Sequence, residues 1–559
     1  MDYTDQQVNA CDPFGIVLSW GAVIDAWTRN PRNLQQYLND YWTGLFVIQQ
    51  QVVKRAMGNL VPDYIAPASR DERFQDNAWV ENPWFDFLKE YYLLCTRTIE
   101  DVIFDTPGVP EKTRRRAAFW TRQMLNALAP GNFLWTNPAA LNRFITTGGL
   151  SLTIGFRLWL EDLRRGDISM VEEDAYRLGR DIACTPGSVV YRNDLLEVIQ
   201  YAPATTEVYA VPVVIIAPWI NKYYILDLAP EKSLIRYLVS QGFTVFVTSW
   251  KNPGPEMRAT TFDDYLVMGA LAAIDTARGI CGVPAVHAVG YCIGGTLLAA
   301  LMAWAARDRR TPSPVCHWTL LTALVDFSNP GDIDAFITEG SVRWIEQRME
   351  KSGYLDGRDM GLSFRWLRPN SLVWRYVIQN YLFGETPPPM DVLQWNVDCT
   401  RLPAAMHSDY LRRFYLENRM VEPDALVLAG RPIDLRIVQA PLYAVGTEQD
   451  HIAPWKETFR IAGLVSAPVR YTLATSGHIL GILSPPIDPP KRRYWSGEAT
   501  GLNDPETWRN GVVKAPGSWW HDWLGWLRER CGPMVPARPA GDRNHPALAP
   551  APGTYVLEK

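Results

Sequence analysis

Residues 285–306 combine an apolar run, a turn bracketed by glycines and an Ala/Leu-rich segment. The turn is Gly290-Tyr291-Cys292-Ile293-Gly294-Gly295 and directly follows Ala285-Val286-His287-Ala288-Val289. This order predicts a strand, a tight turn and a helix, with a nucleophile at the turn. Glycines flank such a turn because it leaves no room for side chains. The helix that follows directs backbone N–H groups and its positive dipole end at the same point.

A cysteine at this turn has two interpretations. A thiolate held there accepts an acyl group, which predicts acyl transfer on Cys292. The pattern alone also fits a small buried apolar residue, because free cysteine often packs in that way. The choice between the two depends on whether the chain supplies the other members of a catalytic set.

The chain beyond about residue 185 alternates short apolar runs with helical segments. This alternation is typical of a parallel sheet covered on both faces, so the fold class is α/β. We expect strands at 212–217, 243–250, 286–291, 318–327, 441–446 and 469–474. More than 110 residues separate the fourth strand from the fifth, which is too long for a loop. We interpret about 328–438 as a cap inserted over the active site, within a catalytic domain of residues 186–559.

Residues 1–185 are predicted to be mostly helical. Residues 41–53 have the spacing of a helix, and Asn82 and Pro110 introduce two more. This part of the chain has no paired histidines and no glycine-rich phosphate loop. We therefore expect a helical N-terminal domain with a structural role, or one that pairs with another surface.

Two further residues stand where a nucleophile at such a turn needs them. A cysteine nucleophile requires a base, and the base requires an orienting carboxylate. Asp450 follows the fifth expected strand and His478 follows the sixth, in the chain order nucleophile, acid, histidine. The chain has only seven histidines, so chance is a weak explanation for one at this position. We predict that Cys292, Asp450 and His478 form the catalytic set.

Other residues compete for these roles. His451 adjoins Asp450 and is an alternative base, or a residue that supports the site or faces solvent. Asp326 follows the fourth strand and is an alternative acid or a helix cap. Glu448 is expected in solvent and His287 in the core. The remaining histidines and three cysteines carry no partner signal and are expected to pack in the ordinary way: His317, His407, His521, His545, Cys281, Cys316 and Cys399.

An oxyanion hole is expected beside Cys292. The Ile293 N–H supplies one donor, and the loop after the first expected strand supplies another. That loop covers 218–224, with Trp219, Ile220 and Asn221 as its candidates. The alternative is that these residues form a structural turn.

Composition excludes several classes of function. A net charge of −5 over 559 residues argues against a basic nucleic-acid surface. Eight cysteines without a C-x-x-C pair imply neither a disulfide framework nor a zinc site. Without a signal peptide, or an apolar run of the ~18 residues that a membrane span needs, a cytoplasmic protein is expected. The sequence signals no metal and no organic cofactor.

Several longer motifs resemble one family. With these motifs the chain resembles the class I, single-subunit polyhydroxyalkanoate synthases over roughly residues 70–559. The motifs are 290–296 (GYCIGGT), 220–228 (INKYYILDL), 367–370 (LRPN), 395–400 (WNVDCT), 410–418 (YLRRFYLEN), 450–455 (DHIAPW), 476–479 (SGHI), 517–520 (GSWW) and, in the helical part, 73–79 (RFQDNAW).

The resemblance implies an α/β-hydrolase fold and a specific reaction. The substrate is then a (R)-3-hydroxyacyl-CoA, and the products are a polyester and free CoA, with CoA released rather than held as a cofactor. Cys292 is similar to the family's acylated nucleophile, His478 to its base, and Asp450 to the acid of the elongation step. The helical domain resembles the family's region for dimerisation and granule attachment, and the cap resembles its mobile lid. Expected partners are acyl-CoA, the growing polyester, a second copy and granule-associated proteins, at the surface of cytoplasmic polyester granules.

Three positions depart from the family's usual pattern. Arg401 stands where class I members usually have Asn, and Ser371 replaces a common Asp. Leu480 is bulkier than the Ala expected two residues after His478, and it could narrow the acyl pocket. These departures bear on acyl chain length, for which the surroundings of Tyr291 and Thr296 favour short chains such as 3-hydroxybutyryl.

Two other functions stay open at this point. One is a cytoplasmic thioesterase or acyltransferase of the same fold, in which water or a small alcohol accepts the acyl group. The other is a non-catalytic protein that binds the granule surface. The presence of Cys292, Asp450 and His478 together argues against the second.

Overall fold

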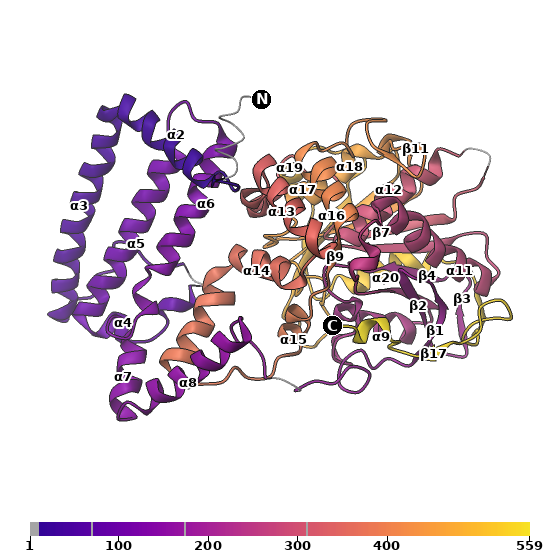
Figure 1. Ribbon diagram of the computed structural model, residues 1–559, viewed down its shortest axis with the longest axis horizontal. Helices are drawn as coiled ribbons and strands as arrows, with labels where there is room; N and C mark the ends of the chain where they lie inside the picture. Colours follow the sequence, from indigo (N-terminus) through magenta and orange to yellow (C-terminus); the bar gives the residue numbers. More distant parts are fainter. Residues whose placement is uncertain (1–10, 69–70, 173–174, 309–310) are drawn as a thin grey trace. The chain divides into compact units, whose positions relative to one another are not determined.

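The computed structural model describes residues 11–68, 71–172, 175–308 and 311–559. The chain divides into two compact units (Figure 1). Unit 1 comprises Met1–Ala175, Thr338–Ser341 and Leu362–Met390, and unit 2 comprises Tyr176–Ile337, Val342–Gly361 and Asp391–Lys559.

Unit 1 is helical, and its helices begin where the sequence supplies a start signal. The Asn82 side chain accepts a hydrogen bond from the Trp84 N–H, and Pro83 occupies the first position of the next helix. Buried apolar side chains such as Trp27 and Ile103 hold the bundle together. Its longer helices are α2 (Ile16–Arg29), α3 (Pro31–Ala56), α5 (Pro83–Phe104), α6 (Glu111–Ala127), α7 (Pro138–Thr146) and α8 (Leu150–Arg165).

Part of the expected cap belongs to unit 1. Residues 362–390 pack with the helical bundle, where η8 (Val377–Leu382) lies against α8 (Figure 1). The Tyr381 hydroxyl donates to Asp162 over 2.8 Å, and the Arg365 guanidinium pairs with Asp167. The remainder of 328–438, apart from Thr338–Ser341, belongs to unit 2, so the insertion contributes to both units.

Unit 2 is built on an 11-stranded sheet, and the six expected strands form its parallel centre. The α/β prediction is thus confirmed. The central strands, in spatial order, are β13 (Val469–Ala474), β12 (Leu442–Thr447), β7 (Val315–Leu321), β6 (Val286–Tyr291), β4 (Val213–Ile216) and β5 (Val245–Trp250).

The bounds of one central strand differ from those predicted, and the strands at the two edges of the sheet were not predicted. The fourth strand ends at Leu321 rather than at residue 327, because Thr322 adopts a left-handed backbone with φ of 44°. Antiparallel strands extend both sides of the sheet: β14 (Arg493–Glu498) and β15 (Lys514–Pro516) beyond β13, and β2 (Leu196–Tyr201), β1 (Gly187–Arg192) and β17 (Ala549–Pro550) beyond β5.

Helices cover both faces of the sheet, as a parallel sheet requires. The core on one face includes α11 (Ala272–Cys281) and α12 (Ile293–Ala306). The core on the other face includes α9 (Leu234–Ser240) and α20 (Trp520–Arg528). Among the described residues, no helix combines the length and the apolar character that crossing a membrane requires.

Candidate active site

Cys292 lies in a strained turn between β6 and α12. Its backbone has φ of 53° and ψ of −125°, a region that L residues rarely adopt. A Cβ on Gly290 would lie 2.5 Å from the Gly295 Cα, and one on Gly294 would lie 2.3 Å from the Ile216 carbonyl oxygen. Side chains are thus excluded at these glycines, which confirms the expected tight turn. The turn holds the half-buried Cys292 at the carboxyl edge of the sheet.

Asp450 and His478 meet at the same edge. Asp450 follows β12 and His478 follows β13, and His478 Nδ1 lies 2.7 Å from Asp450 Oδ2. The two loops are joined by a bond from the Gln449 N–H to the Ser476 carbonyl oxygen. The parallel neighbours β12 and β13 end side by side, so these loops necessarily emerge together.

The Asp450 carboxylate is fully engaged. Its Oδ1 accepts hydrogen bonds from the N–H groups of Ile452 and Ala453, at 2.9 and 2.8 Å. Its Oδ2 accepts from the Thr447 hydroxyl at 3.2 Å and contacts His478. These contacts fix the orientation of the carboxylate and therefore that of the imidazole.

The charges around His478 favour its protonated form. Burial lowers the pKa of His478, but the charge of Asp450, and the charge and hydrogen bond of Cys292, outweigh burial and raise it to about 10. The Tyr291 ring stacks on the imidazole with 5.6 Å between ring centroids. Cys292, Asp450 and His478 are thus brought together in the arrangement of a nucleophile, a base and an orienting acid.

The residues that compete with His478 and Asp450 for the roles of base and acid take part in other interactions. Asp326 accepts from Arg460 at 2.9 Å and from Asn418 at 2.9 Å, and Asp450 occupies the position beside His478. Glu448, expected in solvent, is half-buried and pairs with Arg509. His451 is half-buried beside Asp450. His287 lies in the core as expected, with its Nδ1 2.5 Å from the Nδ1 of His317.

The expected oxyanion loop adjoins the turn that carries Cys292. The loop follows β4, and the carbonyl oxygens of Ile216 and Ala217 occupy the space that a Cβ on Gly294 would need. Trp219 is buried, Ile220 packs at the edge of the core, and the Asn221 amide donates to Cys399 Sγ at 3.3 Å. Leu480, in contrast, is 45% exposed.

Two tyrosines near Cys292 were missed in the sequence. Burial, then the charges of Tyr415 and Cys292, raise the pKa of Tyr410. Burial and the charge of Cys292 likewise raise the pKa of Tyr415. Both come from α16 (Ala404–Tyr410) and the π-helical η9 (Leu411–Leu416) of the insertion. Their motif, 410–418, carries part of the family resemblance, but aromatic spacing of this kind is typical of any buried helix.

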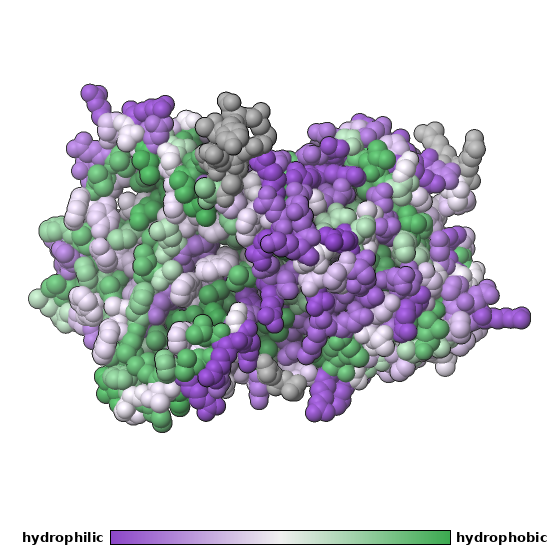
Figure 2. All heavy atoms as spheres, in the orientation of Figure 1, coloured by the Kyte–Doolittle hydropathy of each residue, from purple (hydrophilic) through white to green (hydrophobic). Residues whose placement is uncertain are grey.

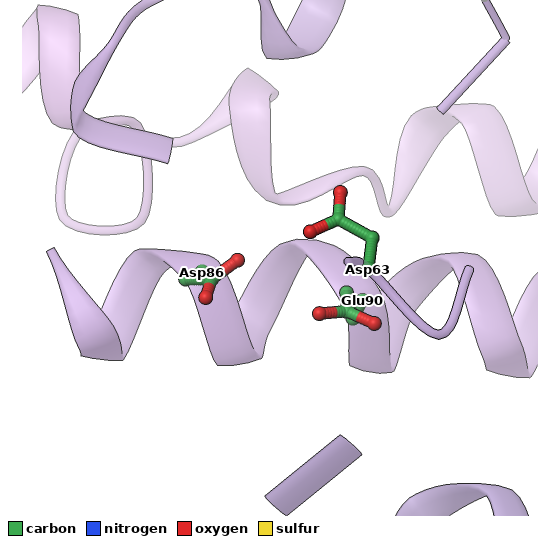
Figure 3. A group of neighbouring side chains, drawn as sticks. All are labelled: Asp63, Asp86 and Glu90. Carbon is green, nitrogen blue, oxygen red and sulfur yellow. The ribbon is translucent and has the colours of Figure 1, made fainter. Parts of the chain in front are cut away.

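Unit 1 contains a cluster of three carboxylates, Asp63, Asp86 and Glu90 (Figure 3). Two cations pair with it: Arg55 pairs with all three carboxylates, and Lys89 pairs with Asp63 and Asp86, both at 3.1 Å. The Glu90 carboxylate also accepts from the backbone of the Tyr64 segment at 2.7 Å. This arrangement accounts for the cluster as an ion-pair network that ties α3 and the segment after it to α5.

Comparison with known proteins covers nearly the whole chain. Residues 70–238 match the family described as poly-beta-hydroxybutyrate polymerase (PhaC) N-terminus, and residues 212–485 match the alpha/beta hydrolase fold. A poly(3-hydroxyalkanoate) polymerase of Methylorubrum extorquens is 42% identical over 546 residues, which cover 96% of this chain and 89% of the relative. The chain belongs to the poly(3-hydroxyalkanoate) polymerase family. The corresponding PhaC subunit of Cupriavidus necator is 40% identical over 533 residues, covering 94% and 88% of the two chains.

Membership of the poly(3-hydroxyalkanoate) polymerase family makes this chain an enzyme of the acyltransferase type. The PhaC polymerase subunit of Rhizobium meliloti is 39% identical over 547 residues and covers 97% of this chain and 88% of its own length. The family match confirms the resemblance seen in the sequence, and the match to the alpha/beta hydrolase fold agrees with the observed sheet and turn.

Proposed function

We propose that this polymerase joins (R)-3-hydroxyacyl groups from acyl-CoA into a polyester through a thioester on Cys292. The observation that carries the proposal is the contact of His478 with Asp450 at 2.7 Å, together with the raised pKa that Asp450 and Cys292 give to His478. A histidine poised to accept the proton of a neighbouring thiol is what an acyl-accepting cysteine needs.

The first half-reaction loads the enzyme. His478 takes the Cys292 proton, the thiolate attacks the thioester carbonyl carbon, and a tetrahedral intermediate forms. Its oxyanion accepts hydrogen bonds from the Ile293 N–H and from a backbone N–H of residues 218–224. The bond from carbon to the CoA sulfur then breaks, and His478 returns the proton to the leaving thiolate. Exchange of one thioester for another is nearly isoenergetic, which suits a cysteine better than a serine.

The second half-reaction extends the chain. A 3-hydroxyl group loses its proton and attacks an acyl thioester, an ester bond forms as the carbon–sulfur bond breaks, and the thiolate that leaves takes up the proton. His478 is the base for this hydroxyl, because both Asp450 oxygens already accept hydrogen bonds and the carboxylate is held against the imidazole. The insertion contributes by keeping water from the acyl-enzyme, since water would hydrolyse it.

The acyl chain is proposed to be short. This part of the proposal rests on the resemblance of the Tyr291 and Thr296 surroundings to the class I pattern. Tyr410 and Tyr415 add bulky buried side chains within electrostatic reach of Cys292. No cofactor takes part in this scheme, and CoA leaves as a product.

We also propose that unit 1 attaches the enzyme to the polyester. The α3 helix is apolar on two faces. Its inner face buries Gly44, Ile48 and Val52. Five large apolar side chains on α3 and just after it are at least half exposed, and Figure 2 shows apolar residues gathered over this unit. They are Leu38, Trp42, Phe46, Val53 and Met57. An exposed apolar stripe of this kind fits an apolar surface, or a second copy of the chain.

The test is CoA release and polymer recovery with 3-hydroxybutyryl-CoA, for the unaltered enzyme and for Cys292→Ala. We expect both products from the former, neither from the latter, and an acyl adduct on the Cys292 peptide by mass spectrometry. Release of CoA with only free hydroxy acid would make the protein a thioesterase. Full polymer formation by Cys292→Ala would overturn the covalent mechanism.

A further inference from the structure

Three consecutive cations lie beside the loop that carries His478. Lys491, Arg492 and Arg493 precede or begin β14. The Thr475 N–H donates to the Arg493 carbonyl oxygen over 3.0 Å, and the Arg493 N–H donates to the Thr475 hydroxyl over 3.1 Å. Since β13 ends at Ala474, the basic run 491–493 lies at the same edge of the sheet as His478.

One motif supports both the His478 loop and the basic run. The Trp519 and Trp520 indoles donate to the carbonyl oxygens of Gly481 and Ile482, each over 2.9 Å. Two residues earlier, the Gly517 N–H donates to the Arg492 carbonyl oxygen over 2.9 Å. Gly517 has φ of 107°, a conformation that favours glycine. The motif 517–520 thus fixes the basic run relative to the catalytic histidine.

The basic run has no carboxylate partner among the residues that the structure describes. Residues 476–497 contain one acid, the exposed Asp488, against these three cations. The acids on neighbouring elements are engaged elsewhere: Asp522 pairs with Arg470 at 2.6 Å, and Glu448 pairs with Arg509. The run therefore keeps its positive charge available.

The guanidinium of Arg492 is partly withdrawn from water. Its side chain is half-buried without an ion pair among the described residues, and burial lowers its pKa. Removing a guanidinium from water without a partner costs free energy, so such a group is suited to bind an anion. Phosphate groups are suitable anions, because arginine binds them with a pair of parallel hydrogen bonds.

We infer that Lys491, Arg492 and Arg493 bind the phosphate groups of the CoA moiety. The inference rests on the proposed function, in which the acyl thioester reaches Cys292. In CoA the flexible pantetheine arm separates the thiol from the pyrophosphate and the ribose phosphate. With the thioester at Cys292, the phosphates must therefore lie well away from the thiol, and the basic run offers them positive charge at the same edge of the sheet as His478.

The test compares ligands with and without the phosphates. Two variants remove the charges: Lys491→Gln/Arg493→Gln alters the two exposed cations, and Arg492→Gln alters the half-buried one. Arg543→Gln is the matched control. Arg543 is exposed and has no ion pair among the described residues, and its loop contacts the end of α11, which leads to the opposite edge of the sheet.

Binding of free CoA and of pantetheine is measured by calorimetry in the Cys292→Ala background, which prevents turnover. Each loss of a charge-assisted contact is expected to weaken CoA binding roughly tenfold or more. Pantetheine binding should not change, and Arg543→Gln should bind CoA like the parent. In the active enzyme, the KM for acyl-CoA should rise while the KM for the acyl-pantetheine thioester stays constant.

Two results would overturn the inference. One is wild-type CoA affinity in both variants. The other is an equal loss for CoA and pantetheine, which indicates a structural effect. The proposed function is tested separately by acylation of Cys292 with acyl-CoA. If CoA binding depends on the basic run but Cys292 is not acylated, the covalent mechanism is wrong and the inference about the basic run still holds.

Discussion

At the level of single residues, the protonation of His478 depends on Asp450. Burial alone would lower the pKa of the imidazole, and the carboxylate at 2.7 Å is the first of the groups that raise it to about 10. The proposed chemistry needs a proton on His478 when CoA leaves and a free nitrogen when a hydroxyl attacks. The carboxylate is therefore the group that sets the balance between these two states.

The substitution Asp450→Asn tests this dependence. The amide carries no charge, so the pKa of His478 should fall and its imidazolium should lose the stabilisation that the carboxylate gives. We expect CoA release to fall by about tenfold or more at neutral pH. Asp326→Asn, which removes a carboxylate bound to Arg460, is the control. Unchanged CoA release by Asp450→Asn would contradict the assignment.

The same variant makes a prediction about stability. The folded pKa of His478, about 10, lies above its ordinary value of 6.5. Protonation therefore stabilises the folded state fully below pH 6.5, and this contribution is lost as the pH rises through 10. The free energy of unfolding, measured with urea between pH 6.5 and 10, should fall less steeply for Asp450→Asn than for the unaltered enzyme.

A site residue could be predicted from the sequence where it directly follows a predicted strand. Cys292, Asp450 and His478 each come after an apolar run that reads as a strand. Parallel strands end at one edge, so their meeting follows from the pattern. Tyr410 and Tyr415 come from the insertion, where side-chain spacing gives no direction relative to the sheet. Their proximity to Cys292 required the structure.

At the level of elements, the candidate oxyanion loop 218–224 depends on segments far away in the sequence. The Trp395 indole donates to the Lys222 carbonyl oxygen over 2.7 Å, and the Thr400 N–H donates to the Ile220 carbonyl oxygen over 3.1 Å. This gives the motif 395–400 a structural role. It pairs with the loop that follows β4 and fixes two of its carbonyl groups.

Lys222 closes the other side of this loop. Its buried ammonium donates to the carbonyl oxygens of Val556 and Glu558, over 2.7 and 2.8 Å, and pairs with Asp398 at 2.8 Å. The central strands could be predicted from the sequence because each is a continuous apolar run. The contacts of Lys222 could not be predicted, because a lone lysine gives no indication of a partner more than 330 residues later.

Lys222→Met should loosen the loop without altering the thiol. Methionine fills a similar volume but leaves the two carbonyl oxygens unpaired. Acylation of Cys292 by acyl-CoA needs the oxyanion hole and should slow by about tenfold. Alkylation by iodoacetamide forms no oxyanion and should continue at the original rate. Lys232→Met, which breaks the partly exposed pair with Asp391, is the control. Equal loss of both reactions would show a general disruption of the site instead.

At the level of the whole molecule, the two units differ in what they expose. The sheet and its helices in unit 2 bury their apolar runs on both faces. In unit 1, the outer face of α3 leaves Trp42 and Phe46 at 62% and 60% exposure. The sequence predicted helices here, but not the second apolar face. Helical periodicity identifies an apolar stripe without showing which stripe the bundle covers.

This difference predicts how the enzyme associates with its product. Trp42→Gln/Phe46→Gln should weaken binding to polyester particles about tenfold. Roughly half of each side chain is exposed and would move from water to the polyester surface, and the variant loses the free energy of that transfer. Binding is measured by co-sedimentation with preformed particles, and initial CoA release in their absence should stay unchanged. Leu502→Gln/Val513→Gln removes two exposed apolar side chains from unit 2 and should bind like the parent. If both double variants sediment equally, the stripe on α3 is not the attachment surface. If the Trp42 variant instead changes only its oligomeric state, the stripe contacts a second copy of the chain.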